Sequence, residues 1–244
     1  MGALRQPPFL RYTRGVSRFT WIQTRDGSPT LWNNELGESF RSVKGAFTES
    51  WAAFIEPALA HLPASEGPVV VGEFGLGPGT NWVLWSLAFR ALQPQRSSRY
   101  VVIERDVTSF ELGLQEWRQR ATELSTFLAS RDIALSPEQI AAALESCPHP
   151  EIFPSLKQAE QSSARAEIWF HDPFGFDVNP EGYTPETLAQ CARLWARQGW
   201  GGSYACNRHF RDALESVPGV STSTVPTGGG GLKRERLEFT WTQP

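Results

Sequence analysis

The sequence predicts an α/β fold, in which helices cover both faces of a mostly parallel β-sheet. The first observation is residues 69–85, where a short apolar strand runs into a glycine-rich turn and then into an apolar helix. The second is the apolar strand 100–103, which ends at an acid. The third is residues 166–186, where polar and aromatic side chains follow the strand 168–170. Because open α/β sheets bind ligands beyond the carboxyl ends of their strands, all three stretches predict a site there.

The glycine turn is the most informative of these stretches. Gly75, Gly77 and Gly79 allow positive φ and allow a ligand to approach the main chain without meeting a Cβ. The N–H groups at the start of the following helix add hydrogen-bond donors. A dinucleotide site has the spacing G-x-G-x-x-G, but here the third glycine comes one residue early and Thr80 takes its place.

Two acids flank this turn. Glu73 stands before the first glycine, where a carboxylate would repel a pyrophosphate and attract the ammonium group of an amino-acid ligand. Glu104 ends the next strand, where an acid can hold the two hydroxyls of a ribose. Dinucleotide enzymes share the second acid, so only Glu73 and the glycine spacing count against a nicotinamide enzyme. A turn that binds nothing is the other alternative.

Length, charge and cysteine content exclude several classes of protein. A chain of 244 residues fits one α/β domain with appendages. The net charge of −3 argues against a wholly basic nucleic-acid binder and leaves room for a local basic patch. Three cysteines and four histidines show no metal-ligand spacing, so we expect reduced thiols and no metal. We expect a cytoplasmic protein, because no stretch resembles a signal peptide or reaches the ~20 apolar residues of a membrane span.

We divide the chain into an N-terminal lead-in, residues 1–62, and a main domain, residues 63–244. The lead-in begins with a basic arm that either contacts phosphates or is a solvated extension. A turn at 26–29, a strand at 30–32 and a helix at 47–62 follow, and we expect them to cover one edge of the sheet. The arginines of the arm are Arg5, Arg11, Arg14, Arg18 and Arg25.

The main domain carries further periodic segments. Ser136 has the signature of a helix N-cap, with proline and glutamine in the first turn, and Asn207 begins another helix. The pattern also predicts a long helix at 107–130, a helix at 184–198 that stops at Gly199, a strand at 200–206, and a hairpin of 220–225 with 235–241.

The glycine turn, E-x-G-x-G-x-G, resembles the loop of S-adenosylmethionine (SAM) dependent methyltransferases. The segments 26–31, 35–38, 42–49 and 72–81 resemble the methyltransferase half of the bifunctional tRNA wobble-uridine enzyme family MnmC. Two further stretches resemble the same family: Trp169, Phe170, Asp172 and Phe174 with the N-P pair and the T-P-E triplet that follow them, and the loop 228–235.

The resemblance implies a class I SAM-dependent methyltransferase (Rossmann-like) sheet with an N-terminal β/α lead-in and a C-terminal antiparallel hairpin. It implies SAM as cofactor and tRNA as partner, with methylation of a wobble-uridine aminomethyl group or a similar amine. We expect a stand-alone domain without the flavin-dependent oxidase half. The implied cofactor-binding residues are Glu73, Gly75, Gly77, Gly79, Asn81 and Glu104; the implied catalytic residues are Asp172 and Phe174; and the implied substrate or RNA contacts are Tyr183, Lys233 and Arg234.

Methyl transfer to nitrogen explains why an acid at Asp172 and an aromatic side chain at Phe174 would be useful. The enzyme must aim the lone pair of a neutral amine, and Asp172 can accept a hydrogen bond from that amine and stabilise its growing positive charge. Phe174 can stack on a base or face the cation. Alternatively, Asp172 caps a turn and Phe174 belongs to the core. His171 replaces an apolar residue of the family, and we interpret it as a loop or core histidine.

One departure from the family points to a rival function. The family ends its third strand with an acid that holds the adenine amine. Here residues 152–153 form only a short apolar pair, and no acid follows them. Either the strand is irregular or the adenine pocket is altered. The rival is therefore a catalytically impaired domain of the same fold that binds RNA or a protein partner.

Overall fold

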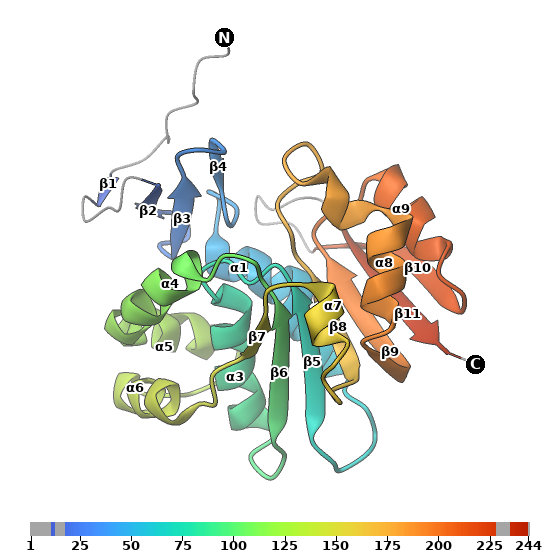
Figure 1. Ribbon diagram of the computed structural model, residues 1–244. Helices are drawn as coiled ribbons and strands as arrows, with labels where there is room; N and C mark the ends of the chain where they lie inside the picture. Colours follow the sequence, from blue (N-terminus) through green and yellow to red (C-terminus); the bar gives the residue numbers. More distant parts are fainter. Residues whose placement is uncertain (1–10, 13–17, 228–234, 244) are drawn as a thin grey trace.

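A computed structural model describes residues 11–12, 18–227 and 235–243, and its main feature is a seven-stranded sheet (Figure 1). The five central strands run parallel, and the hairpin at one edge runs antiparallel, as the sequence predicts. In order across the sheet the strands are β10 (Val220–Pro226), β11 (Glu235–Thr242), β9 (Trp195–Ser203), β8 (Ala166–His171), β5 (Val69–Phe74), β6 (Ser98–Ile103) and β7 (Glu151–Phe153).

Helices cover both faces of this sheet and bury two separate cores. Alternation along β8 shows the division, because Ile168 and Phe170 belong to one core and Trp169 to the other. The first core takes side chains from α3 (Thr80–Leu92), α4 (Thr108–Gln119), α5 (Ala121–Ala129) and α6 (Pro137–Ser146). The second takes them from α7 (Leu156–Ala159), α8 (Pro185–Ala192) and α9 (Arg208–Glu215), with the short 3₁₀ helix η2 (Pro180–Tyr183).

The lead-in forms a four-stranded antiparallel sheet and one helical rod. The sheet contains β1 (Arg11–Tyr12), β2 (Phe19–Gln23), β3 (Pro29–Asn33) and β4 (Glu38–Ser39). The rod runs through α1 (Ala46–Ser50), a π-helical segment η1 (Trp51–Ile55) and α2 (Glu56–Ala60). The widened turn ends at Ile55, shortly before Pro57, which lacks the N–H of a regular helix, and the helix continues through the proline.

The lead-in sheet lies over the carboxyl ends of the central strands (Figure 1), so the edge that it covers is the one at which these strands end. The two residues that follow its last strand contact the segment after β8 directly. Phe40 packs on Phe174 with ring centroids 4.7 Å apart, and Arg41 forms an ion pair with Asp172. The lead-in is therefore part of the wall of any site at that end of the sheet.

Two predicted helices have different bounds. The segment 107–130 is not one helix, because the chain bends at Arg120 (φ −106°, ψ 23°) between α4 and α5. Trp117 ties α4 to the glycine turn by donating its Nε1–H to the Pro78 carbonyl (2.7 Å). The bend then lets Leu124 and Leu128 of α5 face the core. Tertiary contact here overrides a continuous helical pattern.

The predicted helix 184–198 is shorter, and its end belongs to β9. Trp195 stacks on Trp241 of the hairpin with ring centroids 4.6 Å apart, so burial in the sheet wins over helical periodicity. Gly199 is not a helix stop: a Cβ there would lie 2.3 Å from the Trp241 ring and from the Glu167 carbonyl oxygen. The strand therefore runs over Trp195–Ser203 rather than 200–206.

Several other expectations are confirmed. Ser136 caps α6 in a reciprocal capping box with Gln139, and Asn207 caps α9. The pair at 152–153, for which the sequence left the structure open, lies in a short strand, β7, which pairs in parallel with β6. His171 is a buried core histidine, stacked on Phe210.

Among the described residues, no helix is long and apolar enough to span a bilayer.

Candidate active site

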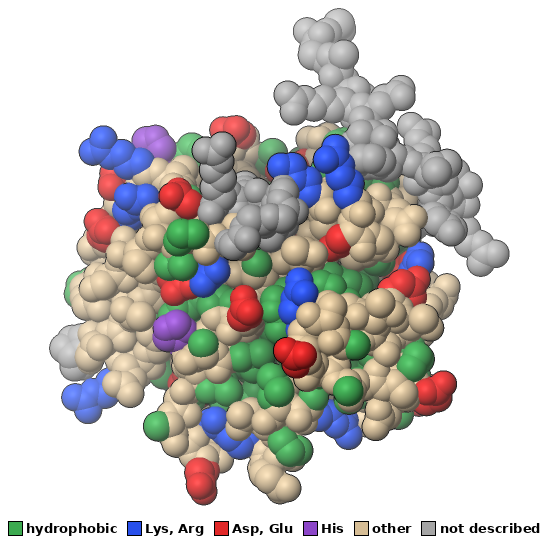
Figure 2. All heavy atoms as spheres, turned by 180° about the vertical axis from the view of Figure 1, so that it is seen from behind, with side chains coloured by type: hydrophobic (Ala, Val, Ile, Leu, Met, Phe, Trp, Pro, Cys, Tyr) green, Lys and Arg blue, Asp and Glu red, His purple; other side chains and the backbone are tan. Residues whose placement is uncertain are grey.

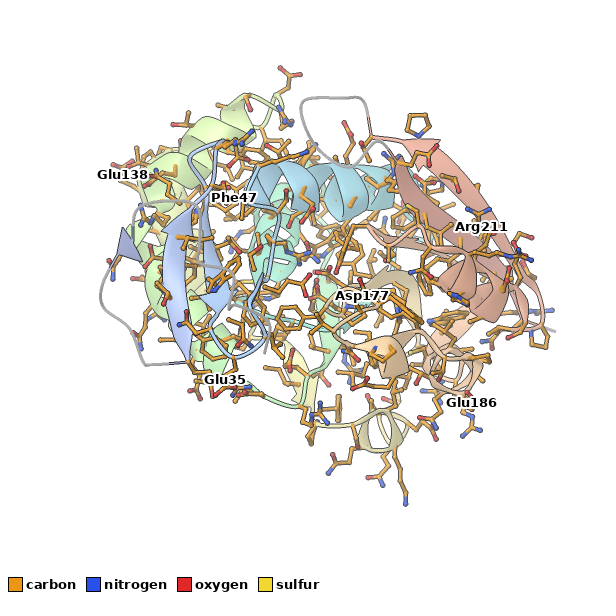
Figure 3. All side chains as sticks on the ribbon, turned by 90° about the horizontal axis from the view of Figure 1, so that it is seen from above. Glu35, Phe47, Glu138, Asp177, Glu186 and Arg211 are labelled. Atoms are coloured by element: carbon orange, nitrogen blue, oxygen red, sulfur yellow. The ribbon has the colours of Figure 1, made fainter. Side chains whose placement is uncertain are left out.

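A cavity of about 550 Å³ opens where the parallel strands end, beneath the lead-in sheet. This volume is in the range of small-molecule and cofactor sites. Figure 3 looks down on this end, with Glu35 in the lead-in and Asp177 in the loop after β8; the next residues, Leu36 and Val178, both line the cavity. Among the predicted site residues, those that line it are Gly75, Gly77, Glu104, Asp172 and Phe174.

The glycine turn has the left-handed backbone that its sequence predicts. Gly75, Gly77 and Gly79 have φ of 90°, 53° and 77°, and Gly79 caps α3. The protein itself fills the space that a Cβ would need. At Gly75 a Cβ would lie 2.6 Å from the Asp172 carbonyl oxygen, and at Gly77 it would lie 2.7 Å from Phe40. The glycines thus let the functional segments pack against one another.

Glu104 lies at the end of β6 and lines the cavity. Its Oε2 accepts hydrogen bonds from the N–H groups of Leu76 (3.1 Å) and Gly77 (3.4 Å) in the glycine turn. Its Oε1 accepts one from the N–H of Asp106 (3.0 Å). The carboxylate therefore joins two loops, and it presents negative charge where the prediction puts ribose hydroxyls.

Glu73 lies behind the cavity wall instead of at its mouth. Its side chain is fully buried, where Oε1 accepts a hydrogen bond from Asn81 Nδ2 (2.7 Å) and Oε2 accepts one from the Tyr100 hydroxyl (2.9 Å). Burial and the nearby charge of Asp172 raise the pKa of Glu73 to about 8. The sequence predicts that Glu73 contacts a ligand ammonium group directly, but its side chain is not part of the cavity lining. It instead accepts a hydrogen bond from Asn81 and so supports that residue.

Asn81 connects this acid to Asp172. The same Nδ2 donates to Asp172 Oδ2 (2.9 Å), while Asn81 Oδ1 and the Thr80 hydroxyl are buried without a partner in the described part of the chain. Asp172 Oδ2 also pairs with Arg41 Nη2. Burial raises the pKa of Asp172 to about 7, although the Arg41 charge opposes the shift.

Both of these contacts fall on Oδ2 of Asp172. No described residue forms a hydrogen bond with Oδ1, and Asp172 lines the cavity. The geometry therefore leaves one carboxylate oxygen for a ligand, while the other is held by a cation and an amide. Such an oxygen can accept a proton or a hydrogen bond from an amine.

Aromatic side chains form the neighbouring wall. The Phe174 ring lies 4.7 Å from that of Phe40, which is 5.7 Å from Phe19, and all three residues line the cavity. Tyr183 is buried behind them, where its hydroxyl donates to the carbonyl oxygen of Phe174 (3.0 Å). Tyr183 thus stabilises the loop after Asp172. It is not part of the cavity lining, where its predicted contact with substrate would form.

The predicted phosphate contacts are only partly described. Lys233 and Arg234 lie outside the described residues, as do Arg5 and Arg14 of the arm. Arg18 lines the cavity, where it pairs with Glu35 (3.0 Å) and with Asp106. Figure 2 shows the molecule from behind the view of Figure 1. On this face acidic and basic side chains are interspersed around a central group of hydrophobic ones.

Sequence reasoning missed Arg41, Phe40 and the hydroxyl of Tyr100. Arg41 follows a short strand in a polar segment, and nothing in a single sequence separates a buried arginine from a solvated one. The sequence pattern places Tyr100 in a strand and gives it no further role. A buried acid in β5 requires a hydrogen-bond donor from a neighbouring strand, and this requirement could have pointed to the Tyr100 hydroxyl.

The residues present fit SAM. The cavity has the volume of a cofactor site, and the glycine turn and Glu104 form one wall. At the start of α3, buried polar atoms of Thr80 and Asn81 have no partner among the residues that the structure describes. Among the described residues, no group of three or more metal-ligating side chains comes together.

Comparisons with known proteins agree with this fit. Residues 119–239 match the family model described as S-adenosyl-L-methionine-dependent methyltransferase. The chain is 25% identical over 233 residues to the tRNA 5-methylaminomethyl-2-thiouridine biosynthesis bifunctional protein MnmC of Pseudomonas putida, a match that covers 87% of this chain and 33% of the relative. The corresponding protein of Pseudomonas entomophila is 32% identical over 182 residues, which cover 71% of this chain and 27% of the relative. The chain thus spans about a third of the length of these relatives or less.

Solved structures share the fold. The crystal structure of MNMC2 from Aquifex aeolicus superposes with a TM-score of 0.67 at 20% identity, covering 96% of this chain and 73% of that one. A spermidine synthase in complex with the transition-state analogue AdoDATO superposes with a TM-score of 0.60 at 11% identity, with the same coverage. The family match favours SAM over our nicotinamide alternative. The chain belongs to the S-adenosyl-L-methionine-dependent methyltransferases and is homologous to the methyltransferase part of MnmC.

Proposed function

We propose that this methyltransferase acts on nitrogen, methylating the aminomethyl group of a tRNA wobble uridine or a similar amine. One observation carries the proposal: Asp172 lines the same cavity as the glycine turn and leaves one carboxylate oxygen without a described partner. The MnmC relatives, whose name refers to a methylaminomethyl uridine of tRNA, support the choice of substrate.

The glycine turn and Glu104 would hold the cofactor, with Asn81 and Glu73 supporting the start of α3. Bound there, SAM supplies an electrophilic methyl group. Asp172 accepts a hydrogen bond or a proton from the amine through Oδ1, which leaves the nitrogen lone pair available and stabilises the positive charge that develops on nitrogen. Phe174 and Phe40 offer aromatic faces against which a base can stack, and they exclude water from the amine.

The decisive experiment is mass spectrometry of tRNA nucleosides from cells with and without this protein. The proposal predicts that methylaminomethyl uridine falls and its aminomethyl precursor accumulates in the deficient cells. Purified protein and SAM should then convert the accumulated precursor. Unchanged levels of both nucleosides would exclude wobble uridine and leave another amine as the substrate.

A second candidate function is a domain that binds RNA or a protein but transfers no methyl group. The observation that favours it is the occupation of Glu104, whose two oxygens already accept three backbone hydrogen bonds, together with the absence of an acid after β7. Calorimetry separates the two functions. Absence of heat at millimolar SAM would support the binding domain, whereas saturable binding would support the enzyme.

A further inference from the structure

Arg41 lies at the centre of the site although it comes from the lead-in, outside the matched region 119–239. We propose that Arg41 is the positioning residue that favours the ionised form of Asp172 and fixes Oδ2, so that Oδ1 can receive a proton from the substrate amine. The proposal rests on the proposed function for the identity of the amine. The charge state of Asp172 can nevertheless be measured without it.

The backbone around Arg41 is fixed before any ligand arrives. The N–H of Phe40 donates to the Leu31 carbonyl of β3 (2.9 Å), and the N–H of Arg41 donates to the hydroxyl of Thr30 (3.1 Å). Both Thr30 and Arg41 are buried. The lead-in sheet therefore holds Arg41 in a position from which its guanidinium pairs with Asp172, and it limits the other groups that the guanidinium can reach.

The guanidinium is placed at a cost in stability. Its side chain is 3% exposed, and in the described part of the protein neither Nε nor Nη1 has a hydrogen-bond partner. The Phe54 ring lies 5.5 Å away and supplies only a cation–π contact. Buried N–H groups without acceptors are unfavourable, and buried ion pairs are often no more stable than apolar replacements. A functional role explains why the pair is there.

The charges around Asp172 show what Arg41 opposes. Burial raises the pKa of Asp172 most, and the negative charge of Glu49 raises it further; Arg41 is the cation that lowers it. The other titratable groups that face this cluster from neighbouring elements are Glu73 on β5, Tyr100 on β6, Tyr183 on η2 and Tyr204 after β9. The tyrosines are neutral, because burial raises the pKa of each of them.

The proton balance is simple. An alkylamine reaches the site mainly as an ammonium ion, whose nitrogen has no free electron pair. Transfer of one proton from this nitrogen to Asp172 Oδ1 gives a neutral amine and a neutral carboxylic acid. The freed electron pair would form the new N–C bond while the methyl–sulfur bond of SAM breaks and S-adenosylhomocysteine leaves, and the nitrogen would become positive again. The carboxylic acid returns its proton to water before the next turnover. A carboxyl group that was already protonated could not take part.

The direct test is a titration of the Asp172 carboxyl by ¹³C NMR, with the signal assigned by its loss in Asp172→Asn. The proposal predicts that Arg41→Gln raises this pKa by about 1 to 3 units, the usual effect of a close opposite charge. Arg41→Lys should recover part of the shift. Arg18→Gln is the matched control, because Arg18 lines the same cavity and pairs with Asp106 instead of Asp172; it should leave the value unchanged. An unchanged pKa in Arg41→Gln would overturn the proposal.

Glu49→Gln provides a test of opposite sign. Removing this negative charge should lower the pKa of Asp172, which general loss of structure would not do selectively. If Arg41→Gln fails to fold, Glu49→Gln and Arg41→Lys decide the matter: a value that moves in neither variant would refute the role of charge. All of these titrations use the full chain without any ligand.

Activity gives an independent measurement. The acid limb of the pH profile of kcat/KM should move up by the same amount as the NMR value in Arg41→Gln, and the rates should converge above that limb. A merely structural defect would lower the rate equally at every pH. If the NMR shift appears but no amine is methylated by the native protein, the proposed function fails and the role of Arg41 in ionising Asp172 stands.

Discussion

At the scale of single residues, two buried carboxyl groups share one amide, and only one of them pairs with a cation. Asn81 Nδ2 donates to both Glu73 and Asp172, but only Asp172 meets Arg41. Glu73 has both oxygens engaged, whereas Asp172 lines the cavity and its Oδ1 has no hydrogen bond from any described residue. The two environments therefore give Glu73 a supporting role and Asp172 a reacting one. The sequence alone shows only an acid at each position and does not show this difference.

Asp172→Asn should separate chemistry from binding. The amide keeps the shape of the side chain and an oxygen for Arg41, but it cannot take a proton, so we expect kcat to fall by about 10²- to 10⁴-fold. S-adenosylhomocysteine affinity, measured by calorimetry, should change little. Asp172→Ala is a poorer test, because it strands a buried arginine and should cost about 3–5 kcal/mol of stability. Near-native turnover in the Asn variant would refute the assigned role.

Glu73 should give the protein a characteristic pH dependence of stability. Burial raises its pKa from 4.5 to about 8, so the folded state binds more protons than the unfolded state between these values. This contribution to the free energy of unfolding is complete below pH 4.5 and is lost as the pH rises through about 8. Urea denaturation should show a steeper decline with pH in the native protein than in Glu73→Gln.

The exposed residue Glu66 provides the control for that measurement. Glu66→Gln should keep the slope of the native protein over the same pH window. Equal slopes in the native protein and in Glu73→Gln would mean that the buried carboxyl does not take up a proton on folding.

At the scale of elements, the glycine turn and the segment after β8 are in direct contact. Gly75 and Gly27 have similar left-handed φ of 90° and 84°, but only Gly75 lies against another segment, the Asp172 backbone. Gly27→Ala meets nothing within 4 Å. The two positions therefore separate backbone strain from a clash that moves the site.

Gly75→Ala should lower both stability and methyl transfer. Gly27→Ala should cost only the left-handed backbone strain, about 1–2 kcal/mol, and should leave the transfer rate unchanged. Gly75→Ala pays a similar strain and must also displace the Asp172 carbonyl. Thermal unfolding and initial rates on the two variants measure this difference. If both variants kept native rates, contact between the turn and Asp172 would be irrelevant to catalysis.

The elements also show what a single sequence can predict. Local chemistry identified the α6 capping box at Ser136, the Asn207 cap and the parallel strands, since each depends on neighbours in the chain. The bend at Arg120 and the start of β9 at Trp195 depend on distant partners, Pro78 and Trp241. Periodicity continues smoothly through both positions, so it could not reveal them.

At the scale of the whole molecule, the lead-in and the main domain share a core and a site. Phe54 and Ile55 of the lead-in rod pack in the same cluster as Val71 and Phe170 of the central sheet. The sequence predicted the acid at Asp172 and the glycine turn because their motifs are local. It did not predict Arg41, because the contact joins segments that are far apart in the chain and only the fold brings them together.

The predicted division at residues 62 and 63 can be tested by truncation. Since the lead-in supplies buried aromatic and aliphatic side chains to the main core, residues 63–244 alone should lack a cooperative thermal transition. Circular dichroism and calorimetry of the truncated chain beside the full chain would show this. A cooperative transition in the truncated chain would establish the main domain as an independent folding unit.

The central claim is that the cavity at the carboxyl ends of the strands is the SAM site and that it faces Asp172. A crystal structure with S-adenosylhomocysteine tests this claim most directly. We expect the ribose beside Glu104, the amino-acid moiety beside the glycine turn, and the sulfur on the side of Asp172 Oδ1. The claim would be contradicted by a cavity closed by Phe40 and Phe174, or by a ligand bound elsewhere on the molecule.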